Sequence, residues 1–326
     1  MEMSWADKRV FVTGGTGFLG SWLVKSLVEN KAKVVVLQRD VVPESPFDIF
    51  GLYDKATIVH GSVDDYDAVE RAMIEHEVDT VFHLAAQTIV GTAVRSPLPT
   101  FKTNIMGTVN VLEAARRNDR IKGIVVASSD KAYGSHVKLP YTEDAVLAGE
   151  YPYDVSKSCA DLIAQSYFKT YGIPVGITRC GNLYGGGDLN FSRIVPGTIQ
   201  SILRNESVII RSDGNYIRDY FYVKDAVNSY LTLGENVGRG DVKGQAFNFG
   251  TNTPISVIEI VKKIVEISGR KNIEVKILNQ ASNEIREQYL LCKKVQEVLG
   301  WRPKYNLDLA LKETFEWYKD YFSRIT

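Results

Sequence analysis

A tyrosine and a lysine are separated by three residues in the segment Tyr153-Asp-Val-Ser-Lys157. On a helix, residues four apart lie on the same face, so these two side chains can meet. An ammonium beside a phenol favours the phenolate, which makes the tyrosine a candidate acid–base group. To act near neutral pH, a phenol must lose about 3 units from its ordinary pKa of about 10. The pair therefore predicts proton transfer to or from a hydroxyl group of a substrate.

A second reactive group, Ser129-Asp130-Lys131, follows a strand-like run that ends at Ala127-Ser128. A hydroxyl, a carboxyl and an amine in a row can hold a substrate oxygen, donate a proton and accept one. For Lys131 to be a base its amine must be neutral, again about 3 units below its ordinary pKa. An exposed charge pair in a loop is the alternative explanation of Asp130 and Lys131.

A glycine-rich turn follows the first strand-like run, where residues 10–20 read VFVTGGTGFLG. Such glycines allow a tight turn and a close approach of the backbone to a pyrophosphate. The helix that follows directs its free N–H groups and the positive end of its dipole at the phosphates. The turn predicts a nicotinamide dinucleotide site. The residues expected to contact the cofactor here are Gly14, Thr16, Gly17, Phe18, Leu19 and Gly20.

The end of the second strand-like run, Gln38-Arg39-Asp40, bears on the choice between NAD and NADP. A carboxylate at this position bonds the ribose hydroxyls and repels a 2′-phosphate. Arg39 is able to pair with a 2′-phosphate through a bidentate contact. We therefore favour NADP over NAD, while Asp40 leaves NAD open.

The elements that must position these residues alternate between strands and helices. Short β-branched runs predict strands at 10–13, 33–37, 57–60, 80–84, 123–128 and 175–179, and amphipathic stretches predict helices at 21–29, 66–76, 103–117 and 153–171. Near-continuous apolar strands joined by helices indicate a parallel sheet covered on both faces. The fold class is therefore α/β, a Rossmann-type doubly wound parallel sheet.

The strand–helix rhythm breaks after about residue 182. The remaining pattern predicts helices at 194–204, 224–233, 257–268, 293–299 and 307–322, a strand at 246–249, and a strand-turn-strand around 213–215. We expect a dinucleotide-binding domain of residues 1–181 plus about 224–253. Residues 182–223 and 254–326 would form a smaller C-terminal substrate-binding α/β lobe, with the active site between the two parts.

The composition excludes several classes of partner. Lys plus Arg equals Asp plus Glu at 39 each, so nothing favours a nucleic acid. Three widely spaced cysteines fit a reducing compartment, and four histidines lack the spacing of metal ligands, so no metal is expected. No apolar run approaches the roughly 20 residues that span a bilayer, and no signal core precedes the first strand. We expect a cytoplasmic protein without a membrane partner.

Taken together, these motifs resemble the extended short-chain dehydrogenase/reductase family over essentially the whole chain. Further motifs that resemble the family are His83-Leu-Ala-Ala86, Asn104-Ile-Met-Gly107-Thr108, Arg179-Cys-Gly-Asn182-Leu-Tyr-Gly185 and Arg218-Asp-Tyr-Phe-Tyr-Val-Lys-Asp225. The resemblance implies that Ser129 and Tyr153 hold the C4 hydroxyl of a nucleotide-linked sugar, and that Lys157 holds the nicotinamide ribose. It implies further cofactor contacts at Ser62, Val63, Leu84, Ala85, Ala86 and Asn104. Ser62 stands where the family tends to place an aspartate against the adenine amine.

Within the family, Asp130-Lys131 is similar to the acid–base pair of the cytidine-diphosphate-glucose 4,6-dehydratases. Likeness to that group extends to Gln87 after the HLAA motif, to Gly185-Gly-Gly-Asp188 and to Arg193-Ile-Val-Pro196. The resemblance implies that Tyr153 takes the C4 hydroxyl proton as hydride leaves C4, after which Lys131 removes the C5 proton. Asp130 would then protonate the departing C6 hydroxyl, and hydride would return to C6.

Two other functions stay open. A C4 epimerase would use Tyr153 and Lys157 without elimination, and simple epimerases more often have small residues in place of Asp130-Lys131. A catalytically silent, cofactor-sensing protein on the same fold would usually lack the tyrosine–lysine pair.

The substrate is expected to carry a nucleoside diphosphate, whose roughly two negative charges need cations in the second lobe. The resemblance implies substrate contacts from Gln87, Thr88, Asn182, Arg193, Arg218 and Arg286. The chain has Arg218-Asp-Tyr where the cytidine-diphosphate-glucose enzymes tend towards Arg-Pro-Trp, so uridine, thymidine and guanosine substrates stay open. In relatives the helices that correspond to 103–117 and 153–171 often form a dimer, so we expect a homodimer.

Overall fold

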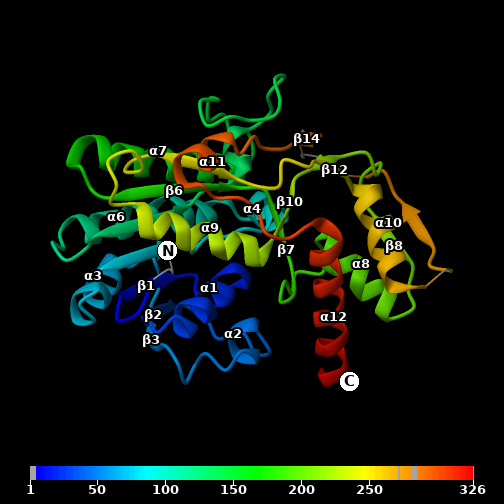
Figure 1. Cartoon of the computed structure of the whole chain (residues 1–326), viewed down its shortest axis with the longest axis horizontal. Helices are drawn as coiled ribbons and strands as arrows, with labels where there is room; N and C mark the ends of the chain where they lie inside the picture. Colours follow the sequence, from blue (N-terminus) through cyan, green and yellow to red (C-terminus); the bar gives the residue numbers. More distant parts are fainter. Residues whose placement is uncertain (1–4, 271, 281–284, 326) are drawn as a thin grey trace.

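The computed structural model describes residues 5–270, 272–280 and 285–325, and its centre is a seven-stranded, fully parallel sheet (Figure 1). The strands run in the order β11-β6-β5-β4-β1-β2-β3. Their bounds are β1 (Arg9–Thr13), β2 (Lys33–Gln38), β3 (Thr57–His60), β4 (Thr80–His83), β5 (Gly123–Ala127), β6 (Val175–Cys180) and β11 (Ala246–Phe249). The strand order reverses between β1 and β4, where ligands of such sheets bind. The predicted doubly wound parallel sheet is confirmed.

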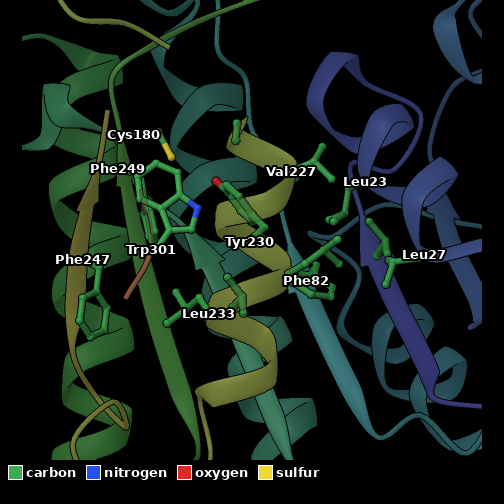
Figure 2. Packing of buried hydrophobic residues seen from close by; sticks show 14 of the residues in the cluster. Leu23, Leu27, Phe82, Cys180, Val227, Tyr230, Leu233, Phe247, Phe249 and Trp301 are labelled. Atoms are coloured by element: carbon green, nitrogen blue, oxygen red, sulfur yellow. The ribbon is translucent and has the colours of Figure 1, made fainter. Parts of the chain in front are cut away.

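Helices cover both faces of this sheet. One face carries α3 (Tyr66–Glu75), α6 (Gly107–Arg116) and α7 (Pro152–Tyr171), and the other carries α1 (Phe18–Glu29), α2 (Pro46–Ile49), α9 (Val223–Asn236) and α11 (Lys293–Leu299). Side chains alternate between the two layers, as they must on a strand: Phe11 packs on the first face, and Val10 and Val12 on the second. Figure 2 shows Tyr230 and Leu233 of α9 lying between Phe82 and Trp301.

The other part of the chain builds a second core beside the carboxyl ends of the main strands. It contains α8 (Ile194–Leu203), α10 (Val257–Ser268) and α12 (Leu307–Ile325), which lie together on the right of Figure 1. Three small sheets accompany them: β7 (Asn182–Tyr184) with β10 (Tyr220–Tyr222), β8 (Val208–Ile210) with β13 (Val275–Ile277), and β9 (Ile217–Arg218) between β12 (Ile255–Ser256) and β14 (Glu287–Gln288). The core of this part includes Ile199, Ile260 and Phe315.

The structure differs from the sequence pattern in two places. The strands on either side of Gly214 do not pair with each other, because β8 joins β13 whereas β9 joins β12 and β14. The region expected as one helix from 103 begins as a π-helical turn, η1 (Lys102–Met106), before α6, and two short helices precede it, α4 (Val90–Arg95) and α5 (Pro97–Phe101). A π turn often marks a functional site. Here it contains Asn104, whose buried side chain is used in the site described below.

The division into two domains stays a prediction. Helix α11, expected in the second lobe, packs against α9 on the main sheet, and Trp301 joins the same core. Within the described ranges, no helix combines the length and the apolar character that crossing a bilayer requires.

Candidate active site

The glycine turn between β1 and α1 forms a cradle with little space for side chains. Gly14 has a φ of +69°, and a Cβ atom there would lie 2.7 Å from the backbone nitrogen of Ala85. A Cβ atom at Gly20 would collide with the carbonyl oxygen of Gly14. Gly17 is the exposed N-cap residue of α1 and has no side chain to cap the helix, which leaves the first N–H groups for a ligand. The cradle fits the pyrophosphate of a dinucleotide.

Two segments predicted to contact the cofactor lie against this cradle. The backbone nitrogen of Leu84 donates to the carbonyl oxygen of Thr13 at 3.1 Å, and that of Ala85 donates to the Thr13 hydroxyl at 3.2 Å. Residues 84–86 are therefore adjacent to the glycine turn. The side chains of Phe18 and Leu19 pack on the hydrophobic cores. These two residues can therefore contact a phosphate only through their backbone N–H groups.

The other predicted cofactor residues lie along the ends of β2 and β3. Arg39 and Asp40 are exposed and form an ion pair of 2.6 Å with each other. Val63 is buried against α6, and its carbonyl oxygen accepts a hydrogen bond from the Asn110 amide at 2.9 Å. Ser62 is half-buried, as is Thr16 in the glycine turn. Cofactor contacts at these residues stay predictions.

His83 connects the glycine turn to α6. Its Nδ1 lies 2.8 Å from the Thr13 hydroxyl and its Nε2 lies 3.0 Å from the Thr108 hydroxyl. The Thr108 hydroxyl donates to the carbonyl oxygen of Asn104 at 2.7 Å, so it accepts from Nε2–H, which assigns the Nε2–H tautomer. Burial lowers the pKa of His83 to about 3, with a smaller effect from the charge of Lys157. His83 is therefore a neutral structural link.

Asn104 holds the segment that follows β4. Its Oδ1 accepts from the Gln87 backbone nitrogen at 2.7 Å, and its Nδ2 donates to the Gln87 carbonyl at 3.1 Å and to the Ser156 hydroxyl at 2.8 Å. These contacts fix Gln87 beside α7, the helix that carries Tyr153 and Lys157. In this structure the Asn104 amide positions other residues of the site.

The structure brings the predicted catalytic residues together at the carboxyl end of β5. Ser129 is the N-cap residue of a short 3-10 helix, η2 (Asp130–Tyr133), and its hydroxyl accepts from the Lys131 backbone nitrogen at 3.2 Å. The same hydroxyl donates to Asp130 Oδ1 at 3.1 Å and lies close enough to the phenol of Tyr153 to oppose the rise in its pKa. The serine hydroxyl thus lies next to both the phenol and the carboxyl group.

The carboxyl group of Asp130 is suited to carry a proton. The residue is 2% exposed, and its Oδ2 has no hydrogen-bond partner within the described part of the chain. Burial raises the pKa of Asp130 from 3.8 to about 6, although the charge of Lys131 and the Ser129 hydrogen bond act in the opposite direction. A carboxyl with such a pKa can act as a general acid near neutrality.

The phenol of Tyr153 is not acidified by the protein groups around it. Burial raises its pKa, and this effect outweighs the opposing Ser129 hydrogen bond and the charge of Arg193. The ammonium of Lys157 is buried, donates to the Ala127 carbonyl oxygen at 2.7 Å, and has its pKa lowered by burial to about 8. The protein groups alone therefore do not lower the phenol pKa, because both side chains are desolvated.

The predicted substrate residues lie around this cluster, and several are already engaged. Arg193 pairs with the buried Asp188 at 3.0 Å and reaches the Thr88 hydroxyl at 3.4 Å. Arg218 is buried and donates to the carbonyl oxygens of Ile217, Ile285 and Arg286 at 2.6 to 3.0 Å. The exposed Arg286 side chain forms an ion pair of 3.2 Å with Asp213, and Asn182 begins β7. Their contacts with a substrate stay predictions.

Two residues of the site were not selected from the sequence as functional. Asp188 fixes Arg193, and only its place at the end of the GGGD motif could have indicated it. Gln288 on β14 accepts a hydrogen bond from Lys131 Nζ at 3.3 Å. No sequence motif marks Gln288, since the two residues are 157 positions apart.

The chain is similar to known proteins in sequence and in structure. The sequence model of the GDP-mannose 4,6-dehydratase family matches residues 11–314. The chain is 33% identical to CDP-glucose 4,6-dehydratase from Salmonella typhimurium, over 97% of this chain and 91% of that protein. The structure is similar to UDP-glucose 4-epimerase from Thermotoga maritima, solved with UDP-glucose (TM-score 0.86, 31% identity, 96% and 99% of the two chains). It is also similar to dTDP-glucose 4,6-dehydratase from Bacillus anthracis in complex with NAD (TM-score 0.85, 27% identity, 96% and 97%).

The relatives include both dehydratases and epimerases, so the likeness identifies the family and leaves the reaction to the site residues. The resemblance to extended short-chain dehydrogenases/reductases is confirmed: the chain belongs to the GDP-mannose 4,6-dehydratase family of these enzymes.

Proposed function

We propose that the protein is a nucleotide-sugar 4,6-dehydratase, which converts a nucleotide-linked hexose into its 4-keto-6-deoxy form. The observation that supports the proposal is the cluster in which the Ser129 hydroxyl donates to Asp130 and lies next to the phenol of Tyr153. Tyr153 belongs to the oxidation at C4, and Asp130 belongs to the loss of water at C6. An enzyme that only oxidises and reduces C4 has no use for a buried acid next to its serine.

The proposed cofactor is a nicotinamide dinucleotide held by the glycine cradle and by residues 84–86. When bound, it accepts hydride from C4 and returns hydride to C6. Lys157 lies buried next to the end of β5 and would contact the nicotinamide ribose. The positive charge of an oxidised nicotinamide would lower the phenol pKa of Tyr153, which the protein groups alone raise.

The proton transfers can be assigned to three side chains. Tyr153 removes the proton of the C4 hydroxyl, and Lys131 as a neutral amine removes the C5 proton that the new ketone acidifies. Asp130 gives its proton to the C6 oxygen as the C6–O bond breaks, and water leaves. The Lys131 ammonium then returns its proton to C5.

After one turnover Tyr153 has gained a proton and Asp130 has lost one. The Ser129 hydroxyl lies between these two groups, which gives the proton a route back. The sum of all steps is the loss of one water from the sugar, without net reduction of the cofactor.

For the substrate, we propose a CDP-glucose-like nucleotide sugar. The Asp130-Lys131 pair and the likeness to the Salmonella enzyme support this choice. Mass spectrometry of cytidine-, uridine-, thymidine- and guanosine-linked hexoses, incubated with the enzyme and either dinucleotide, tests it. Loss of one water from one substrate supports a dehydratase and identifies the base, whereas a new isomer of unchanged mass would make the enzyme a C4 epimerase.

For the dinucleotide, NADP is the proposal because Arg39 is exposed at the end of β2. Asp40 opposes it, since this carboxylate pairs with Arg39 and would repel a 2′-phosphate. The nucleotide released when the purified protein is denatured decides between them, and release of NAD alone would refute the NADP preference.

For the assembly, we propose a homodimer formed through η1, α6 and α7. Exposed apolar side chains at Met106 and Leu162 support this face. Light scattering measures the mass in solution, and Leu162→Glu should convert the dimer into a monomer. A wild-type protein that is monomeric at all concentrations would refute the dimer.

A further inference from the structure

Gln288, on β14 in the second part of the chain, contacts Lys131, the proposed base of the elimination. Its Oε1 accepts from Lys131 Nζ at 3.3 Å, and the residue is 0% exposed. Its Nε2 is also buried, without a hydrogen-bond partner in the described ranges. Burying the amide nitrogen of Gln288 without a hydrogen-bond partner costs folding free energy, so a functional reason for this residue is to be sought.

The backbone fixes Gln288 relative to Lys131. Gln288 is paired with Arg218 in the small sheet of β9 and β14. Just beyond it, the strand is tied to Tyr141, whose backbone nitrogen donates to the Tyr289 carbonyl at 3.0 Å and whose carbonyl accepts from Leu291 at 2.8 Å. The Tyr141 hydroxyl in turn donates to the carbonyl of Gly134 at 2.6 Å, directly after η2. The Lys131–Gln288 contact is therefore held from both ends.

The charges around the Lys131 amine explain why the partner is an amide. The carboxyl groups of Asp130 and Asp154 both lie near enough to Lys131 to interact with its charge. Further charged groups interact with these two carboxyl groups: Arg218 and Asp219 with Asp130, and Glu150 with Asp154. A base needs the neutral amine, so a third carboxylate at the position of Gln288 would work against it. An amide carbonyl accepts the same hydrogen bond without a full negative charge.

We propose that Gln288 is a positioning residue for the elimination step, which orients the Lys131 amine towards the substrate without holding it as the ammonium. The inference deepens the proposed function and rests on Lys131 being the C5 base. It gives the second part of the chain a role in the chemistry as well as in substrate binding.

The change Gln288→Glu tests the inference because it keeps the shape and adds one negative charge. A carboxylate this close favours the charged form of its partner by about 1 to 3 pKa units. The pH at which C5 exchange with deuterated water is half-maximal should therefore rise by about 1 unit or more, and exchange at neutral pH should fall about tenfold. Oxidation at C4, followed as absorbance of the reduced nicotinamide under single-turnover conditions, should be unchanged.

Gln245→Glu is the matched control, because Gln245 also accepts a hydrogen bond from a lysine, Lys294, at 3.0 Å, but on the surface. It should leave the C5 exchange profile where it is. Gln288→Leu removes the hydrogen bond without adding charge, so it should slow C5 exchange at every pH without moving the half-maximal pH. If Gln288→Glu does not fold, Gln288→Leu decides.

Separate results refute the proposed function and the role of Gln288. A wild-type enzyme that releases no water from any nucleotide sugar refutes the proposed function. A working dehydratase whose Gln288→Glu variant keeps the wild-type pH profile, or whose Gln288→Leu variant keeps the wild-type exchange rate, overturns the role of Gln288 alone.

Discussion

Replacing Asp130 by asparagine should change the stability of the protein in a pH-dependent manner. The pKa of Asp130 rises from 3.8 to about 6 on folding, mainly through burial. The folded chain therefore binds this proton more tightly than the unfolded chain, and the wild type loses stability as pH rises through this range. The shift of about 2 units corresponds to a loss of stability of about 3 kcal/mol. This loss is complete above pH 6 and absent below pH 3.8.

The asparagine variant cannot ionise at this position and does not pay this penalty. Relative to wild type, its free energy of unfolding should rise by about 2 kcal/mol between about pH 4.5 and about pH 8. Asparagine also places an amide nitrogen where Oδ2 has no partner among the described residues, which costs a constant amount at every pH. The slope with pH is therefore the diagnostic quantity, and the absolute difference is not.

Urea unfolding of both proteins at a series of pH values measures this slope. The same variant should lose dehydration while C4 oxidation persists, because the proton donor for the C6 oxygen is removed. A stability difference between the two proteins that does not change between these pH values would refute the conclusion that burial raises the pKa of Asp130. A variant that still releases water at the wild-type rate would refute its role as the acid.

Four further changes follow from the same geometry. Lys131→Met should abolish C5 exchange with deuterated water and spare C4 oxidation, and unchanged exchange would eliminate Lys131 as the base. Gly20→Ala should abolish dinucleotide binding, measured by calorimetry, because its Cβ would collide with the Gly14 carbonyl; retained affinity would refute the cradle. Arg39→Ala should weaken NADP more than NAD in the same assay, and equal losses would refute a 2′-phosphate contact. Lys157→Met should stop turnover yet stabilise the protein by about 2 kcal/mol at pH 7. The lowered lysine pKa contributes about 3 kcal/mol of this gain, and the lost hydrogen bond removes about 1 kcal/mol. The gain in unfolding free energy should shrink from pH 8 towards 10.5, and a destabilised variant at pH 7 would contradict the expectation.

The sequence by itself determined the features that depend on neighbouring residues. The apolar runs gave the main strands, because a strand buried on both faces must be continuously apolar. The positive φ of Gly14 and the close approach of its carbonyl oxygen to Gly20 belong to one tight turn, and the spacing of Tyr153 and Lys157 follows from the helical repeat. The π turn before α6 was not predicted; it carries Asn104, whose contact with Gln87 joins residues 17 positions apart.

Only the tertiary structure decided how the reactive groups meet and what charge they carry. The proximity of Ser129 to Tyr153 and the Lys131–Gln288 contact involve residues that are not neighbours in the chain, and no local pattern encodes such pairs. The direction of each pKa shift depends on desolvation, which is a property of the packed site. For this reason burial raises the pKa of Tyr153 in the folded protein, and it raises the pKa of Asp130 to about 6.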